Sequence, residues 1–243
     1  MSFFNALLSG SPLSSFMSLF LEAVEDEDGA VTYMPTIAGY TVFVLAMVVF
    51  LIIGCAIGSR KKRINTKQLC FSGLALALGC VASFLTLFEM PMGGSVTALS
   101  MFFISLIGYW YGPVTGIMAA VSYGLIQLTL NPYIVSVPQL MLDYILGFGA
   151  LGFSGFFSKF KSKFAVIYGF LTGAFGRLVF TVLSGWIFFG SYASYYGFKY
   201  GFTYSLAYNS AYICTEAAIT VAILLIPQMR KALAYTKRIA EDQ

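Results

Sequence analysis

Long apolar runs dominate this sequence and limit its possible folds more than any other feature. Seven of them are separated by short polar breaks, at residues 38–58, 68–88, 97–111, 114–131, 138–157, 164–189 and 204–226. A helix needs about 20 mainly apolar residues to cross a bilayer. Only 10% of the residues are charged, whereas roughly a quarter are charged in soluble domains. The sequence therefore predicts an all-α, polytopic membrane protein that lies in a lipid bilayer.

Basic residues are spaced regularly between these runs. They concentrate in "SRKKRINTK" after the first run, in "SKFKSK" after the fifth and in "RKALAYTKR" after the seventh. Segments at these three positions lie on the same side of the membrane, and the positive-inside rule assigns that side to the cytoplasm. We therefore expect a multi-pass plasma-membrane protein with its N-terminus outside and its C-terminus in the cytoplasm.

The runs and breaks divide the chain into four parts. We expect an extracellular amphipathic and acidic leader at 1–37, an extra transmembrane helix with a basic cytoplasmic linker at 38–67, a membrane domain at 68–230 and a cytoplasmic tail at 231–243. In the leader, Pro12 favours a helix start. Apolar residues follow up to Leu21 at helical spacing, which predicts a short amphipathic helix on the outer interface.

The runs 97–111 and 114–131 are joined only by Gly112 and Pro113, which predicts a tight antiparallel hairpin of two helices. The run from 97 is short for a bilayer. We therefore expect the preceding "PMGGSVT" to re-enter or cap the bundle. Its two glycines would allow the backbone to approach a ligand closely.

Three ionisable residues, Asp143, Arg177 and Glu216, lie inside the apolar runs. Each costs about 2.5–3.5 kcal/mol at the middle of a membrane on insertion scales, so each should face the protein interior or a wet cavity. Two interpretations remain open. Asp143 and Arg177 form a buried pair that satisfies itself, or a ligand completes the site.

Aromatic residues surround Asp143 in the sequence and favour the second interpretation. Tyr144 is adjacent, Tyr133 lies across the preceding loop, and the stretch 185–209 is rich in Tyr, Trp and Phe. Ring faces attract a cation, and a carboxylate accepts two hydrogen bonds from an aminopyrimidine or amidine edge. The pattern suits a small, flat, cationic solute, although the same aromatics also fit an interfacial belt.

Motifs for catalysis are absent from the sequence. It has no His, no GxSxG, no HExxH, no phosphate-binding Gly-Lys loop and no carboxylate cluster with metal spacing, so neither an enzyme nor a metal site is predicted. The four cysteines stand singly and suggest neither a disulfide framework nor a metal site. We expect no cofactor and no nucleic-acid partner. Without a Walker motif, any ATP hydrolysis belongs to partner subunits.

Three segments, "GGSVTALSMFFISLIGYWYGPVTGI", "YGLIQLTLNPYIVSVPQLMLDYILGFGALG" and "YSLAYN", resemble the thiamine-specific substrate-binding subunit (S component) of energy-coupling factor (ECF) transporters. The similarity covers about residues 68–230, in the family's order and spacing. It implies a six-helix vitamin-binding bundle that docks on a separate transmembrane coupling protein and two ATPases. The run 38–58 lies outside that pattern as one additional N-terminal transmembrane helix.

The resemblance also implies which residues bind the substrate. It places the ligand carboxylate on Asp143, beside Tyr144, and the family's other ligand-site positions on Tyr133, Arg177, Gly185, Tyr204 and Asn209. A family histidine aligns with Thr181, and two family tryptophans align with Gly94 and Phe189. A lost aromatic face costs about 1 kcal/mol. Thiamine is therefore the leading substrate, while a related pyrimidine or another vitamin-sized cation remains open.

Helix one of these subunits docks on the coupling protein through small residues four apart. Gly73 with Ala77, and Ala75 with Gly79, have that spacing, which allows close contact between helix backbones. We expect the outer loops 89–97 and 190–203 to close over the solute, and partner ATPases to tilt the bundle inward. A stand-alone secondary transporter or channel remains the alternative, for which broken helices at mid-membrane would be typical.

Overall fold

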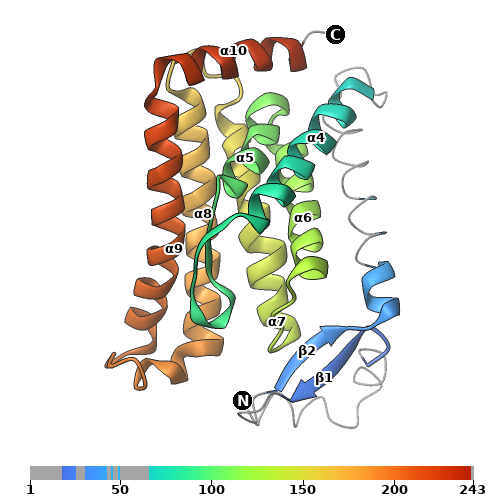
Figure 1. Cartoon of the computed structure of the whole chain (residues 1–243), viewed down its shortest axis with the longest axis vertical. Coiled ribbons are helices and arrows are strands. Elements are labelled where there is room, and N and C mark those ends of the chain that lie inside the picture. The colour runs from blue at the N-terminus through green and yellow to red at the C-terminus, as the bar shows by residue number, and fades with distance from the viewer. Residues whose placement is uncertain (1–17, 26–30, 43–44, 46–48, 50–65, 242–243) are drawn as a thin grey trace.

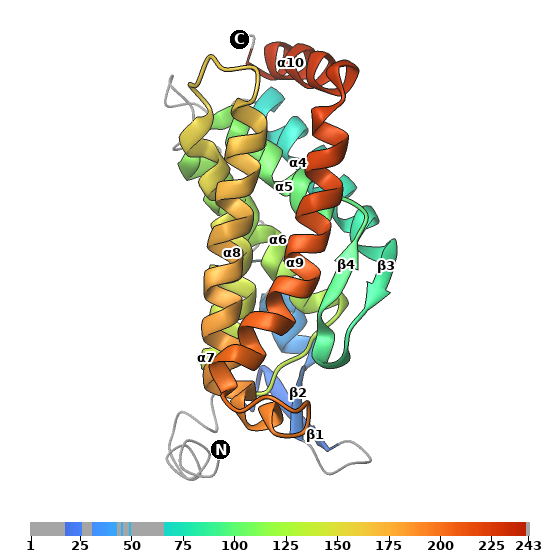
Figure 2. The ribbon, with the colours of Figure 1, turned by 90° about the vertical axis from the view of Figure 1, so that its left-hand side faces the viewer.

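The computed structural model of the chain describes residues 18–25, 31–42, 45, 49 and 66–241. Its helices run side by side along the long axis of the molecule, and one helix lies across their end (Figures 1 and 2). The main helices are α4 (Thr66–Phe84), α5 (Ser100–Tyr111), α6 (Pro113–Leu130), α8 (Ala165–Phe189), α9 (Gly201–Leu225) and α10 (Pro227–Glu241). Between α6 and α8, a further span joins α7 (Val137–Leu140), the π-helical turn η2 (Met141–Gly147) and the 3-10 segment η3 (Ala150–Phe157).

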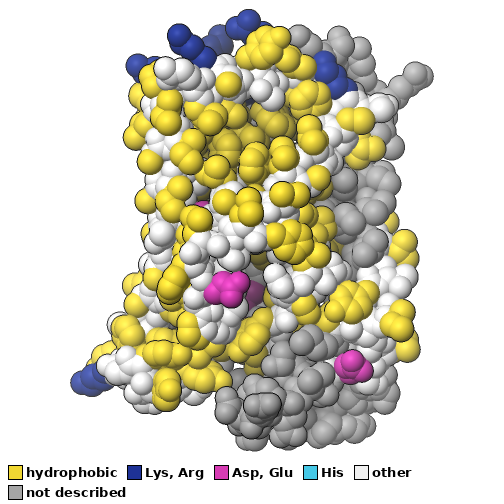
Figure 3. All heavy atoms as spheres, in the orientation of Figure 1, with side chains coloured by type: hydrophobic (Ala, Val, Ile, Leu, Met, Phe, Trp, Pro, Cys, Tyr) yellow, Lys and Arg dark blue, Asp and Glu magenta, His cyan; other side chains and the backbone are white. Residues whose placement is uncertain are grey.

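Five of these segments are long and apolar enough to cross a membrane: Thr66–Phe84, Pro113–Leu130, Val137–Phe157, Ala165–Ala193 and Gly201–Leu225. Ser100–Tyr111 is also apolar but shorter. The helices agree with the predicted all-α, multi-pass fold. Lys and Arg side chains on the face in Figure 3 gather mainly at the α10 end.

Most of α5 is buried, because α4, α6, η3 and α8 all pack around it. There, α5, α6 and η3 contact one another through glycines. A Cβ atom on Gly152 of η3 would lie 2.2 Å from the backbone nitrogen of Ile117, and one on Gly116 of α6 would lie 2.5 Å from Cα of Gly108 in α5. Only glycine permits such close contact between helix backbones. The predicted hairpin also forms, with Gly112 at φ 93° and Pro113 in the first turn of α6.

The expected run 68–88 ends as a helix at Phe84, and a small hairpin follows. Its strands are β3 (Thr86–Glu89) and β4 (Ser95–Thr97), which pair antiparallel around the short turn η1 (Pro91–Gly93). The expected run 97–111 begins as a helix only at Ser100. The segment "PMGGSVT" thus forms the tip and second strand of this hairpin, which lies beside α9 along the side of the bundle (Figure 2).

The C-terminal tail forms a helix and does not extend freely. The Lys237 ammonium of α10 donates to the Ser158 carbonyl and lies 4.0 Å from the centre of the Tyr109 ring. The Tyr111 hydroxyl donates to the Ala240 carbonyl over 3.5 Å. These contacts fasten α10 across the ends of the other helices (Figure 2).

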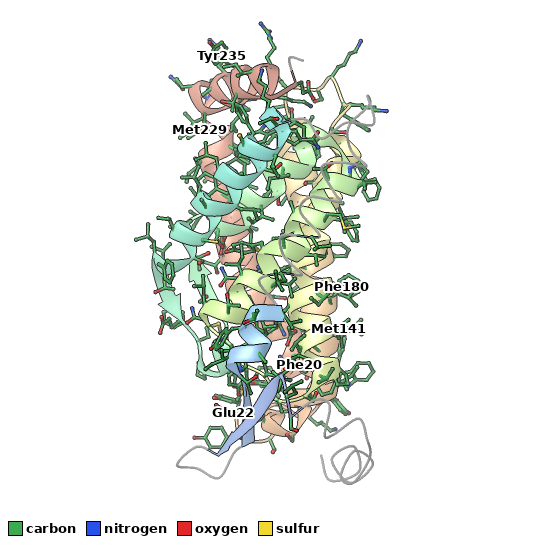
Figure 4. The ribbon with its side chains drawn as sticks, turned by 90° about the vertical axis from the view of Figure 1, so that its right-hand side faces the viewer. Phe20, Glu22, Met141, Phe180, Met229 and Tyr235 are labelled. Atoms are coloured by element: carbon green, nitrogen blue, oxygen red, sulfur yellow. The ribbon has the colours of Figure 1, made fainter. Side chains whose placement is uncertain are left out.

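The leader differs from its prediction where it is described. Leu21–Glu25 (β1) and Val31–Pro35 (β2) form an antiparallel hairpin, so Leu21 does not end a helix. Phe20 and the buried Leu21 pack against the loop and helix around Ile134 and Leu140 (Figure 4). Tertiary packing at Leu21 thus overrides the helical spacing of the sequence. The rest of the expected amphipathic helix, up to residue 17, lies outside the described residues.

The expected extra N-terminal transmembrane helix is described only at its start. Residues 37–42 are helical, as are 45 and 49. The rest of the expected run 38–58, and most of the basic linker to 67, lie outside the described residues.

One of the two predicted docking pairs faces the interior of the bundle and not its surface. Ala75 is 2% exposed, and a Cβ on Gly79 would lie 2.7 Å from Cδ1 of Ile104, so both face α5. Gly73 and Ala77 face outward, and a Cβ on Gly73 would meet no atom within 4 Å. Successive helical residues turn by about 100°, so the two pairs point to nearly opposite sides. Docking through Ala75 and Gly79 is therefore wrong, whereas Gly73 and Ala77 remain a prediction.

Candidate functional site

A cavity of about 590 Å³ lies between the β3–β4 hairpin, the loop 131–136, η2, α8 and α9. Small-molecule pockets usually measure about 300–1,000 Å³. The structure brings all ten predicted site residues to its wall: Gly94, Tyr133, Asp143, Tyr144, Arg177, Thr181, Gly185, Phe189, Tyr204 and Asn209. The cavity lies at the far end of the bundle from α10.

Gln139, which the sequence analysis missed, orients Asp143. The Gln139 side-chain nitrogen donates to Asp143 Oδ2 over 2.7 Å and to the Tyr133 carbonyl over 3.2 Å. Its side-chain oxygen accepts from the Val135 amide over 3.1 Å. The amide thus joins the carboxylate to the loop that carries Tyr133. The only signal in the sequence is the spacing of four residues between Gln139 and Asp143, which places them on one helix face.

Arg177 does not neutralise Asp143 by direct contact. In the part of the chain that the structure describes, the two form no ion pair. The Arg177 guanidinium instead lies 4.0 Å from the centre of the Phe148 ring, and Arg177 Nε has no hydrogen-bond partner among the described residues. The buried ion pair between Asp143 and Arg177, one of the two interpretations left open above, is therefore not formed.

Two aromatic stacks border the cavity. Tyr133 stacks on Phe189 with 6.0 Å between ring centres and 26° between planes. Tyr204 stacks on Tyr196 at 5.4 Å and 11°. Phe189, which replaces a tryptophan of the family pattern, thus keeps an aromatic ring at the cavity. Flat ring faces on two sides of a cavity suit a flat or cationic ligand.

The Tyr144 hydroxyl braces the loop that carries Tyr133. It accepts from the Tyr133 amide over 2.9 Å and donates to the Asn131 carbonyl over 3.1 Å. The ring is also packed among the apolar side chains of Leu128, Ile134 and Leu140.

We expect Tyr144→Phe to fold normally and to weaken ligand binding about tenfold, because the two lost hydrogen bonds are worth about 1 kcal/mol each and hold Tyr133 in place. Calorimetric titration with thiamine, the ligand that the family resemblance implies, measures the change. Tyr168→Phe, on the exposed side of α8, is the control and should bind normally. Equal affinity in Tyr144→Phe and the control would contradict the bracing role.

Asn209, Gly185 and Thr181 form the junction of α8 and α9. The Asn209 side-chain nitrogen donates to the Ser205 carbonyl over 2.9 Å, and its oxygen accepts from the Tyr212 hydroxyl over 2.9 Å. A Cβ on Gly185 would lie 2.3 Å from Ser205 Oγ, so glycine here permits close helix packing beside the cavity. The Thr181 hydroxyl donates to the Arg177 carbonyl over 3.1 Å. A single hydroxyl cannot make all the hydrogen bonds that the two ring nitrogens of the family's histidine could make.

Tyr208, one of the aromatic residues of the stretch 185–209, holds the hairpin over the cavity. Its hydroxyl accepts from the Gly94 amide over 3.1 Å and donates to the Pro91 carbonyl. A Cβ on Gly94 would lie 2.7 Å from the same hydroxyl. Gly94 therefore allows this contact with α9, and a tryptophan would not fit there without a different loop position.

Glu216 is 3% exposed and lies in the interior, as its position in an apolar run predicted. Its carboxylate accepts hydrogen bonds from Thr97, Ser100 and Met101. Among the described residues, no group of three or more His, Cys, Asp or Glu side chains is placed to hold a metal ion.

The fold and the site can be compared with known proteins. The family described as "Thiamine transporter protein (Thia_YuaJ)" matches residues 69–235. The thiamine transporter ThiT of Bacillus subtilis (strain 168) is 37% identical over 117 residues, which cover 43% of this chain and 60% of the relative. The match thus spans less than two thirds of that relative's length.

A solved structure of ThiT from Listeria monocytogenes shares the fold. It has a TM-score of 0.53 and 24% identity, and the likeness covers 75% of this chain and 98% of the other. The family match covers well over half of the sequence, in the region that builds the cavity. The chain therefore belongs to the Thia_YuaJ thiamine transporter family, whose members are membrane transport proteins and not enzymes.

Proposed function

We propose that the chain binds thiamine in the 590 Å³ cavity and serves as the S component of an ECF-type importer. The observation that carries the proposal is the Asp143 carboxylate. It lies on the cavity wall, is oriented by Gln139 and has no ion-pair partner among the described residues. A carboxylate in an apolar bundle is costly unless a counter-charge reaches it, and a cationic ligand supplies that charge.

The charges around the cavity favour a cation. The charged side chains in its described wall are the carboxylates of Glu89, Asp143 and Glu216 and the guanidinium of Arg177, so the formal charge there is negative. Thiamine combines a cationic thiazolium ring with a flat aminopyrimidine. The aromatic stacks of Tyr133 and Tyr204 offer faces to such rings, and Asp143 can accept hydrogen bonds from an aminopyrimidine edge.

The partners are proposed from the family resemblance, and the orientation from the distribution of basic residues. We propose that the outward face of α4 around Gly73 and Ala77 docks on a coupling protein, which two ATPases drive. The basic side chains at the α10 end support a cytoplasmic position for that end. The N-terminus then lies outside, and the cavity opens to the exterior. The outer loops 89–97 and 190–203 close over the ligand, and release follows when the partners tilt the bundle.

A stand-alone transporter is the second candidate, and one observation favours it. The span Val137–Phe157 is irregular, because it passes from an α-helical turn to the π-helical η2 and the 3-10 segment η3. Interrupted helices beside a binding site are typical of secondary transporters.

Two measurements on the purified chain separate these candidates. Calorimetric titration in nanodiscs should give saturable binding of thiamine, with riboflavin, a neutral vitamin, as the control. Liposomes that contain this chain alone should take up no radiolabelled thiamine. Uptake by the chain alone would support the stand-alone transporter, and tighter binding of a related pyrimidine would change the substrate.

A further inference from the structure

The carboxylate of Glu216 on α9 holds the turn that connects the hairpin to α5. Glu216 Oε2 accepts from the Thr97 amide over 3.1 Å and from the Thr97 hydroxyl over 2.7 Å. Glu216 Oε1 accepts from the Ser100 hydroxyl over 3.3 Å and from the Met101 amide over 3.0 Å. Each oxygen therefore holds one side of the turn.

These contacts indicate the role of Glu216. The Thr97 and Ser100 hydroxyls also lie 2.6 Å apart, so one of them donates to the other, and Glu216 holds the two amides and one of the two hydroxyls at any time. Of the about four lone-pair sites of a carboxylate, three are thus used by the turn, although Glu216 also lines the cavity. It is thus a positioning residue, in contrast to Asp143, whose Oδ2 accepts from Gln139 at the cavity wall.

The turn needs this carboxylate for two reasons. Leu99 has φ 71° and ψ 19°, a left-handed conformation that a leucine rarely adopts. Leu99 also precedes the first residue of α5 and has no side-chain acceptor for the free amides of the first turn, which usually receive one. Glu216 provides that acceptor from another helix, and the helix N-terminus favours its negative charge.

The turn is the base of the hairpin that covers the cavity. Thr97 ends β4 and pairs with Thr86 of β3, while Met92, Gly93 and Gly94 at the tip line the cavity. At the tip, α9 holds the hairpin through the neutral hydroxyl of Tyr208. At the base, α9 holds it through the ionised carboxylate of Glu216. Hydrogen bonds to charged groups are roughly twice as strong as neutral ones, so the base is held more firmly than the tip.

We propose that Glu216 fixes the base of the hairpin, so that the hairpin opens at its tip, and that it thereby sets how long a bound ligand stays in the cavity. The residence-time part rests on the proposed function. The anchoring part concerns the hairpin alone and can be measured without any ligand.

The test compares Glu216→Gln with the wild type in hydrogen–deuterium exchange and in binding kinetics. Glutamine keeps the shape but presents an NH₂ group toward donors. Without ligand, exchange in peptides that cover residues 86–101 should become about tenfold faster. Thiamine dissociation, followed by chase of radiolabelled thiamine, should accelerate at least about tenfold, while association changes by less than about threefold.

Thr97→Val is the second variant, because it removes the Thr97 hydroxyl and keeps the carboxylate. We expect an effect in the same direction but smaller, about threefold. The matched control is Thr215→Val one residue before Glu216, where the exposed hydroxyl bonds only to the Ala211 carbonyl of its own helix. Exchange at 86–101 should be unchanged there. If Glu216→Gln does not fold, the comparison of Thr97→Val with Thr215→Val tests the proposal.

Each outcome tests one part of the proposal. Unchanged exchange at 86–101 in the variants would overturn the anchoring role. Faster exchange with unchanged thiamine dissociation would overturn control of residence time, and a loss of affinity that comes only from slower association would overturn it as well. Faster exchange in a protein whose wild type binds no thiamine would support the anchor and refute the proposed substrate.

Discussion

Asp143→Asn should lower the affinity for thiamine at least about 100-fold, which corresponds to about 3 kcal/mol. The substitution keeps the size of the side chain and an oxygen that can still accept from Gln139, so the fold should be retained. It removes the negative charge that faces the cavity, together with the charge-assisted hydrogen bonds to the ligand. Calorimetric titration of the purified variant in nanodiscs measures the loss.

Glu241→Gln is the matched control for this prediction. It makes the same change from acid to amide on α10, where the carboxylate lies 3.7 Å from Lys237 and far from the cavity. Thiamine affinity should equal that of the wild type. If Asp143→Asn bound thiamine as tightly as this control, Asp143 would not be the ligand carboxylate and the proposed mode of recognition would be wrong.

Gly152→Ala should destabilise the bundle by about 3 kcal/mol or more, with a fall in apparent Tm of about 6–12 °C. The new methyl group would lie 2.2 Å from the Ile117 nitrogen and 2.4 Å from the Gly116 carbonyl carbon. Backbone atoms of a packed helix cannot move aside as a side chain does, so η3 and α6 must separate. Thermal unfolding in detergent, followed by circular dichroism, measures the effect.

Gly73→Ala is the control, since its methyl group would meet nothing within 4 Å on the outward face of α4. Its apparent Tm should stay the same or rise slightly, because alanine favours a helix over glycine. Equal melting of Gly152→Ala and Gly73→Ala would show that α6 and η3 do not pack as closely as described.

Much of the site could be predicted because burial of charge is so costly in an apolar bundle. Asp143 and Arg177 stand out in their apolar runs, and both lie at one cavity. Gln139 was missed, and Tyr208 stood out only as one of many aromatic residues in the stretch 185–209, because an uncharged polar residue or a tyrosine is common in membrane segments. Their roles depend on carbonyl and amide groups of loops that approach only in the folded chain.

The direction in which each helix face points was the other feature that the sequence did not predict. Small residues four apart predict a contact surface, but the sequence does not say which partner each surface contacts. The structure turns Ala75 and Gly79 toward α5 and leaves Gly73 and Ala77 outward. At the leader, helical spacing up to Leu21 predicted a helix, whereas Leu21 begins a strand that packs against the loop at Ile134.

The sequence by itself determined the membrane-spanning helices, the tight turn at Gly112 and Pro113, and the need for Asp143 and Glu216 to avoid lipid. These follow from local length, composition and the cost of charge in a bilayer. Only the tertiary structure decided that Asp143 is oriented by Gln139 at the cavity wall, while Glu216 accepts from Thr97, Ser100 and Met101 in the turn before α5. Both are acids in apolar helices. The partners of Glu216 lie more than 100 residues away in the sequence, and local sequence cannot specify such contacts.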